Sequence, residues 1–197
     1  LSGTGTIASK DVGSNKTVSV GTLALGNGSN GGLAANYTLT GGTHQLTVNQ
    51  RPLNATLARQ YDGTTAAAGS TLSSFDALQG GETLTMTGSG TAASANVANG
   101  IAMSSNGNLA LADGTGAASN YSLNSTVINV TQRPISLSGT KIYDGNTTLN
   151  NSIVSVSSGL IGIETLTLTG EVNTNNANVG SYSASGGTLN VGSTTIN

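Results

Sequence analysis

The chain has 197 residues, a formal net charge of −2 and only 7% charged residues, so it lacks the basic surface that nucleic-acid binding requires. Cysteine is absent, which excludes thiol catalysis and zinc–thiolate sites. No apolar run approaches the roughly 20 residues that cross a bilayer as a helix. With 36% hydrophobic residues and two prolines, the composition favours an ordered all-β protein over a disordered chain.

Alternating apolar and polar residues predict short strands. In chain order these are His44–Val48, Glu82–Gly88, Asn108–Ala112, Thr126–Thr131 and Ile135–Ser138. In the second of them Leu84 and Met86 fall on one face and threonines on the other, so the first face is expected to be buried. Clusters of glycine and asparagine, such as residues 26–32, predict turns between the strands. Residues Thr71–Leu78 allow a single helical turn.

The chain repeats itself with a period of 82 residues. Four separated landmarks recur at this offset: Arg51-Pro52 with Arg133-Pro134, Tyr61–Thr65 with Tyr143–Thr148, Glu82–Gly88 with Glu164–Gly170, and Asn96-Val97 with Asn178-Val179. The first 50 residues match the back half of the same unit. The matching segments are Leu1–Gly5 with Met86–Gly90, and Asn36–Leu39 with Asn120–Leu123.

These matches divide the chain into three repeats. Residues 1–50 are the C-terminal part of a first repeat, residues 51–132 are a complete middle repeat, and residues 133–197 are the N-terminal part of a third repeat. The folded module can also begin elsewhere in the cycle. The segment from Leu1 onward has no basic start followed by an apolar stretch, so no signal peptide is visible and we expect an interior piece of a longer chain.

With about six or seven short strands per repeat, the sequence predicts small β-sandwich modules of the immunoglobulin-like kind, arranged in tandem as an elongated array. A β-grasp-like module is the alternative. Pro52 and Pro134 follow strands directly, with no long linker. Because proline restricts its own φ and the residue before it, stiff junctions are expected, and neighbouring repeats are expected to contact one another.

The landmarks resemble a known family. Arg-Pro, a strand, Tyr-Asp-Gly-Thr-Thr, Thr-Leu-Thr-x-Thr-Gly, Asn-Val-Gly and Asn-Tyr-x-Leu are similar to the YDG-type repeats of large bacterial adhesins. These are the filamentous-haemagglutinin-like and high-molecular-weight exoproteins that are often exported by two-partner secretion. The match departs from this pattern at Ala98, which replaces the glycine of Asn-Val-Gly, and at Asn146, which is inserted in the Thr-Thr signature.

The resemblance implies a role in surface adhesion or biofilm formation, outside the cell at the bacterial surface. The partners that it implies are an outer-membrane transporter and the neighbouring repeats of the same chain. Two roles stay open: a passive stalk that holds a distal domain away from the cell, and a module that itself binds a host or matrix glycan or protein. An enzyme is not expected, because no pair of carboxylates suited to glycan hydrolysis is recognisable.

Tyr-Asp-Gly is the motif most suggestive of a site. It occurs at Tyr61, Asp62 and Gly63, and again at Tyr143, Asp144 and Gly145. Its aspartates invite a metal-binding or sugar-binding interpretation. Asp-Gly is more typical of a turn, in which Asp caps its own backbone, Gly takes a positive φ and Tyr packs against a neighbouring strand. We therefore interpret the motif as structural.

No metal or cofactor is expected, because the acidic residues of the middle repeat are few and widely spaced, whereas calcium needs several clustered oxygen ligands. His44 is the sole histidine, and nothing marks the partners of a catalytic triad around it, so we interpret it as a strand-surface residue. Nine Asn-x-Ser/Thr sequons make glycosylation a hypothesis. The sequence names no ligand.

Overall fold

The computed structural model describes residues 1–185 and 187–193. Regular structure in this part of the chain consists of strands and three isolated 3-10 turns, which confirms the predicted all-β class. None of its helices is long and apolar enough to cross a membrane. The chain forms two compact units. Unit 1 holds residues 1–59, 65–94 and 99–129, and unit 2 holds residues 60–64, 95–98 and 130–197.

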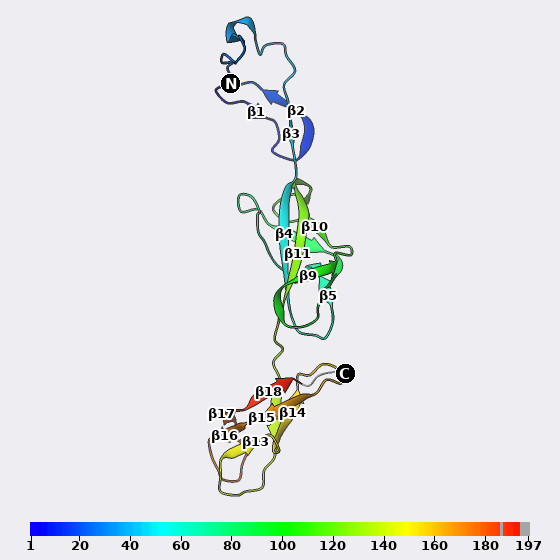
Figure 1. Ribbon diagram of the computed structural model, residues 1–197, viewed down its shortest axis with the longest axis vertical. Coiled ribbons are helices and arrows are strands. Elements are labelled where there is room, and N and C mark those ends of the chain that lie inside the picture. Colours follow the sequence, from blue (N-terminus) through cyan, green and yellow to red (C-terminus); the bar gives the residue numbers. More distant parts are fainter. Residues whose placement is uncertain (186, 194–197) are drawn as a thin grey trace. The chain divides into compact units, whose positions relative to one another are not determined.

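Unit 1 begins with a three-stranded antiparallel sheet of order β1-β2-β3 (Figure 1). Its elements are β1 (Thr6–Ile7), β2 (Gly13–Ser19), the 3-10 turn η1 (Ala34–Asn36) and β3 (Gln45–Val48). An isolated antiparallel bridge joins Ser2 to Ala24. The glycine-rich segment between β2 and β3 contains the predicted turn, in which the Gly28 N–H donates to the Gly32 carbonyl oxygen at 2.9 Å.

The middle repeat is built on a six-stranded sheet of order β5-β8-β9-β11-β4-β6, with β7 and β10 paired separately. The six strands are β4 (Arg51–Gln60), β5 (Ala66–Ala68), β6 (Leu72–Phe75), β8 (Ser89–Ala92), β9 (Ala98–Ser105) and β11 (Tyr121–Thr131). The remaining elements are β7 (Leu84–Thr87), β10 (Ala110–Asp113), η2 (Gly69–Thr71) and η3 (Ala118–Asn120). The long strands β4 and β11 lie side by side (Figure 1).

Most of the core of unit 1 comes from β4, β7 and β11, with alternate residues buried along β4 and β7 and in the second half of β11. The buried side chains of these strands are Leu53, Ala55, Leu57, Leu84, Met86, Tyr121, Thr126 and Ile128. In β7, Leu84 and Met86 are buried and the two threonines are exposed, so the predicted alternation is confirmed. Tyr121 packs against Leu53 and Leu84 in one hydrophobic cluster, which fixes the ring beside β4 and β7.

The helical turn allowed at Thr71–Leu78 does not form. Residues Leu72–Phe75 are strand β6, paired antiparallel with β4, and only the preceding residues Gly69–Thr71 make a 3-10 turn. Pairing with β4 satisfies the backbone groups of β6 that face it, whereas a single helical turn leaves most of its own unsatisfied. The strands predicted elsewhere are confirmed, with shifts of a few residues at their ends.

The described residues of unit 2 form three small antiparallel sheets: β12-β14, β13-β16-β17 and β15-β18. Their strands are β12 (Ser136–Gly139), β13 (Thr148–Asn150), β14 (Val154–Ser158), β15 (Leu166–Thr169), β16 (Glu171–Thr174), β17 (Ala184–Ser185) and β18 (Asn190–Ser193). Val154, Leu168 and Val172 are buried. Fewer buried apolar side chains than in unit 1 indicate a weaker core.

Strand pairing repeats with the period of the sequence. The pair β12-β14 corresponds to β4-β6, the sheet β13-β16-β17 to β5-β8-β9, and the pair β15-β18 to β7-β10. The register repeats as well: Ala67 pairs with Gly90, and 82 residues on Leu149 pairs with Val172. The repeated landmarks therefore mark repeated strand pairs.

Candidate functional site

The two Tyr-Asp-Gly segments are turns of the same geometry. In each, the aspartate Oδ1 accepts the backbone N–H two residues further on at 2.9 Å, and the glycine has a positive φ. The hydrogen-bonded pairs are Asp62 with Thr64 and Asp144 with Asn146, and φ is 76° at Gly63 and 77° at Gly145. Both carboxylates are therefore engaged by their own turns, as expected for Asp-Gly.

The two tyrosines of these motifs differ. Tyr61 lies in unit 2, where its hydroxyl donates to Glu164 Oε1 and its backbone N–H donates to the Thr131 carbonyl oxygen at 2.9 Å. The hydrogen bond to Glu164 raises the pKa of Tyr61. Tyr143 is 62% exposed, so it does not pack against a neighbouring strand as expected. The Tyr61 hydroxyl links the middle repeat to the third.

Glu82 is the counterpart of Glu164, 82 residues earlier in the chain. Two side chains donate hydrogen bonds to the Glu82 carboxylate. Lys10 Nζ lies 2.9 Å from Glu82 Oε1, and the Tyr121 hydroxyl donates to Oε2 at 2.5 Å. The Glu82 side chain is 20% exposed. Each of the two glutamates therefore accepts a hydrogen bond from the repeat that precedes it.

These donors favour the charged form of Glu82. The hydrogen bond from Tyr121, followed by that from Lys10, lowers the pKa of the Glu82 carboxyl below its usual value. In turn, the carboxylate raises the pKa of the Tyr121 hydroxyl and of the Lys10 ammonium. At neutral pH the cluster therefore consists of an ionised glutamate, an ionised lysine and a neutral tyrosine.

Asn120 adds a second link between the first and middle repeats inside unit 1. Its Oδ1 accepts the backbone N–H of Val12 at 2.8 Å, and its Nδ2 donates to Asp11 Oδ1 at 2.8 Å. This donation is the largest cause that lowers the pKa of Asp11. Asn120 begins the Asn-Tyr-x-Leu landmark, and Asp11-Val12-Gly13 corresponds to Asn-Val-Gly. The Asn-Tyr-x-Leu landmark of the middle repeat and the Asn-Val-Gly counterpart of the first repeat are therefore joined by hydrogen bonds.

The arginines of the Arg-Pro landmarks make the same contact in both repeats. Arg51 Nε donates to the Ala77 carbonyl oxygen at 2.7 Å, and Arg133 Nε donates to the Gly159 carbonyl oxygen at 2.8 Å. Both bonds span 26 residues. Each arginine thus ties the start of its repeat to the segment that follows the third strand of that repeat, which explains the recurrence of the landmark.

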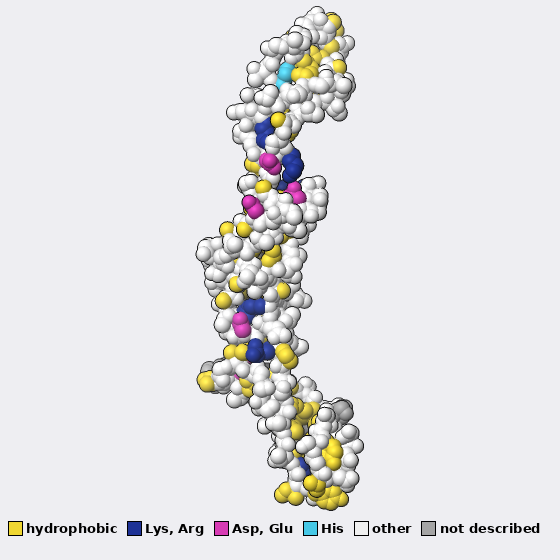
Figure 2. All heavy atoms as spheres, turned by 180° about the vertical axis from the view of Figure 1, so that it is seen from behind, with side chains coloured by type: hydrophobic (Ala, Val, Ile, Leu, Met, Phe, Trp, Pro, Cys, Tyr) yellow, Lys and Arg dark blue, Asp and Glu magenta, His cyan; other side chains and the backbone are white. Residues whose placement is uncertain are grey.

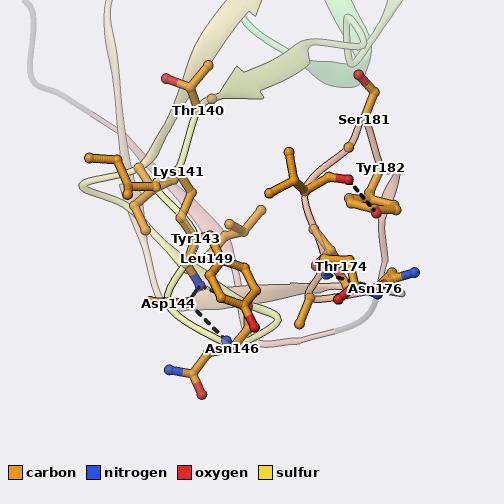
Figure 3. A pocket seen from close by; sticks show the side chains of 17 residues that line it. Thr140, Lys141, Tyr143, Asp144, Asn146, Leu149, Thr174, Asn176, Ser181 and Tyr182 are labelled. Atoms are coloured by element: carbon orange, nitrogen blue, oxygen red, sulfur yellow. Dashed lines mark hydrogen bonds and ion pairs between the residues drawn. The ribbon is translucent and has the colours of Figure 1, made fainter.

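Unit 2 contains a cavity of about 380 Å³ between the loop 140–146 and the segment 174–182 (Figure 3). On one wall Lys141 Nζ lies 2.7 Å from Asp144 Oδ1. On the other wall the Tyr182 hydroxyl donates to the Val179 carbonyl oxygen at 3.3 Å. Together with Tyr143, these residues give the cavity both aromatic rings and polar groups.

Charged side chains are sparse on the face shown in Figure 2, where Lys and Arg lie in small groups with Asp and Glu. Among the described residues, no group of three or more His, Asp or Glu side chains is placed to hold a metal ion. His44 precedes β3, and its Nε2 lies 2.7 Å from the Leu39 carbonyl oxygen. This contact gives the histidine a local structural partner.

Sequence reasoning did not identify Lys10, Glu82 and Asn120 as contact residues. One signal was present: the glutamate recurs at the start of a threonine-rich strand, at positions 82 and 164, in a chain with few charges. Lys10 gave no such signal, because the corresponding residue of the middle repeat is Ala95.

Comparison with protein families agrees with the repeated motif. Residues 43–128 match the family model described as the YDG domain, a span that runs from β3 into β11 and includes the first Tyr-Asp-Gly motif. Searches of curated proteins and of solved structures gave no match to the chain. A YDG domain therefore lies at residues 43–128 of this chain.

Proposed function

We propose that the chain is a non-enzymatic spacer segment of a secreted bacterial surface adhesin. In this role its repeats hold a distal binding domain away from the cell during adhesion or biofilm formation. The proposal is supported by the similarity of the landmarks to adhesin repeats and by the YDG domain at residues 43–128. Sparse charge and the absence of cysteine fit a segment that is exported unfolded, since no premature disulfide can form.

The observation that carries the proposal is the shared role of two glutamates. Glu82 accepts a hydrogen bond from Lys10 of the first repeat, and Glu164 accepts one from Tyr61 of the middle repeat. In the first case Asn120 adds contacts with Asp11 and Val12. Within unit 1, bonds of this kind resist the bending of the first repeat against the middle repeat, which is the mechanical property that a spacer needs.

The proposal also covers the fold of each repeat and the location of the protein. Each repeat is a small β-sandwich of the immunoglobulin-like kind within an elongated array, and a β-grasp-like module is the alternative. The separate pairing of β7 with β10, apart from the six-stranded sheet, supports two layers. Location at the bacterial surface and export through an outer-membrane transporter follow from the resemblance to two-partner-secretion adhesins.

A second candidate function is direct binding of a host or matrix glycan or protein by a repeat. The cavity of unit 2 favours it, because tyrosine rings and amide side chains suit a sugar. Tyr143 and Tyr182 are the aromatic residues of that cavity. The spacer role ranks first, because a hydrogen-bonded glutamate recurs in two repeats, at Glu82 and Glu164, whereas the cavity lies in unit 2.

Binding assays with the isolated chain separate the two functions. The chain is applied to a glycan array, to immobilised fibronectin and to whole cells. The spacer role predicts no saturable binding. Saturable binding that is lost in Tyr182→Ala, and retained in the matched control Tyr37→Ala, would instead favour the glycan-binding role. Tyr37 is an exposed tyrosine of the first repeat and is remote from the cavity in the sequence.

A further inference from the structure

The two longest strands among the described residues, β4 and β11, run parallel to each other. They have 10 and 11 residues and are neighbours in the six-stranded sheet (Figure 1). Three hydrogen bonds along the pair join Gln50 with Ser119, Asn54 with Asn124, and Tyr61 with Thr131. The partners are 69, 70 and 70 residues apart in the sequence. Because this separation stays nearly constant along the pair, both strands run in the same direction.

The direction of the pair decides where the chain enters and leaves the middle repeat. β4 is the first strand of this repeat and β11 is its last. In a parallel pair, the start of one strand and the end of the other lie at opposite ends. β3 ends at Val48 and β12 begins at Ser136, so short segments connect the pair to the strands before and after it. Tension along the chain therefore enters at the start of β4 and leaves at the end of β11.

Forces applied at opposite ends of a parallel pair pull the two strands past each other along their axes. All the hydrogen bonds between the strands are then loaded at the same time, and they must break together. Forces applied at the same end would break these bonds one after another, which takes less force. The length of β4 and β11 increases the number of bonds that share the load.

Side chains on both faces reinforce this pair. The largest fully buried side chains among the described residues all belong to the two strands: Leu53, Leu57, Ile128 and Val130. Close packing on this face opposes sliding and keeps water from replacing a stretched hydrogen bond. On the exposed face, Asn54 Oδ1 accepts from Asn124 Nδ2 at 2.9 Å and from Ser125 Oγ at 2.6 Å. The two strands are therefore held together by their side chains as well as by their backbones.

We propose that β4 and β11 form a shear clamp, which keeps the middle repeat folded under tension applied along the chain. This function goes beyond keeping a distance, because a repeat with the clamp also transmits a pulling force. The use of the clamp in adhesion rests on the spacer role proposed above. The clamp itself rests on the sheet of the middle repeat alone.

Optical tweezers test the clamp on the whole 197-residue chain by pulling it in two geometries. The chain has no cysteine, so introduced cysteines can carry the DNA handles at chosen positions. Asn49→Cys with Gln132→Cys places the handles at opposite ends of the pair. Asn49→Cys with Ser119→Cys places them at the same end, next to the starts of both strands. All three replaced residues are exposed.

The clamp predicts a strong dependence on the pulling geometry. At the same loading rate, the unfolding force with handles at 49 and 132 should be about two- to fourfold higher than with handles at 49 and 119. Unfolding in the first geometry should occur in one step. Equal melting temperatures of the two double-cysteine chains, measured before the handles are attached, exclude a difference in thermal stability as the cause.

A side-chain variant tests the pair itself. Asn124→Ala combined with Ser125→Ala removes the two side-chain links to Asn54 and leaves the backbone bonds in place. With handles at 49 and 132, the rate of unfolding at constant force should rise about fivefold, the effect expected for exposed hydrogen bonds. Asn106→Ala, at an exposed position between β9 and β10, is the matched control and should leave the rate unchanged.

Equal unfolding forces in the two geometries would overturn the proposal. So would stepwise unfolding at low force with handles at 49 and 132, since that would show that the bonds of the pair break one after another. These readouts involve no ligand. The clamp and the spacer role, which the binding assays test, can therefore fail separately.

Discussion

The side-chain oxygen of Asn120 accepts the backbone N–H of Val12 at 2.8 Å across a separation of 108 residues. The same side chain donates to the Asp11 carboxylate. The Asn120 amide therefore acts as donor to one residue and as acceptor from its neighbour, both in the segment Asp11-Val12. Both residues lie in unit 1, and they come from different repeats. The contact makes the landmark that contains Asn120 a connector between repeats.

Replacing Asn120 by alanine should lower the free energy of unfolding of unit 1 by about 1–2 kcal/mol, because two partly exposed hydrogen bonds are lost. Urea unfolding followed by circular dichroism measures the change. The matched control is Asn99→Ala, at an exposed position of β9. Equal stability of the two variants would show that the Asn120 bridge contributes nothing.

Replacing Glu82 by glutamine should lower the melting temperature of unit 1 by a few degrees at neutral pH, since Lys10 loses its ionic partner and Tyr121 its charged acceptor. The pKa of Glu82 is lowered in the folded state, so its contribution is present above the unfolded value of about 4.3 and disappears as pH falls through the folded value. The difference between wild type and variant should therefore narrow below about pH 4.

Differential scanning calorimetry between pH 3 and 8, at roughly physiological salt, provides that comparison. Glu171→Gln is the control, because Glu171 is exposed on β16. A gap between wild type and Glu82→Gln that persists unchanged in acid would rule out an ionised Glu82 as its source.

Thr126→Val should stabilise the chain by about 1 kcal/mol. The Thr126 hydroxyl is buried in β11 without a hydrogen-bond partner among the described residues, and valine has nearly the same shape without the polar atom. Thr87→Val, on the exposed face of β7, should change stability much less. Chemical denaturation of both variants decides the matter, and a destabilised Thr126→Val protein would indicate that the hydroxyl has a partner.

Alanine at the glycines of the two Tyr-Asp-Gly turns should cost stability by different amounts. At Gly145 an added Cβ meets nothing within 4 Å, so the loss of about 1 kcal/mol is backbone strain alone. At Gly63 the Cβ would lie 3.0 Å from Ile161 Cγ2, so Gly63→Ala should lose more. Thermal melts would show this order, and Gly145→Asn should recover part of the loss because asparagine tolerates positive φ. Identical losses at Gly63 and Gly145 would contradict the account.

Local sequence patterns were enough to predict much of the fold. Alternation identified the buried face of β7, with Leu84 and Met86 inside, because the period of two is a property of the strand itself. Asp-Gly identified both turns, since the positive φ at Gly63 and Gly145 is a local requirement. The period of 82 residues identified the repeats, and the structure shows that strand pairs recur with that period.

Contacts between residues far apart in the sequence could not be predicted from local patterns. Nothing in the spacing of Lys10 or Tyr61 identifies the glutamate that each one meets, because these contacts depend on how loops of one repeat meet the strands of the next. The same limit applies to residues 72–75, where pairing with β4 outweighs a weak local preference for a turn. Tyr143 was misjudged for a related reason: its packing depends on partners outside its own motif.

The central claim, that bonds to Glu82 hold the first and middle repeats of unit 1 in a fixed relation, is tested most directly by a distance measurement between spin labels. The chain has no cysteine, so Thr17→Cys on β2 and Thr87→Cys on β7 place one label in the first repeat and one in the middle repeat. Ser74→Cys with Thr87→Cys is the control pair within the middle repeat. Double electron–electron resonance should give a single distribution as narrow as the control, and one that broadens in Glu82→Gln. A broad distribution in the otherwise unaltered chain would contradict the claim.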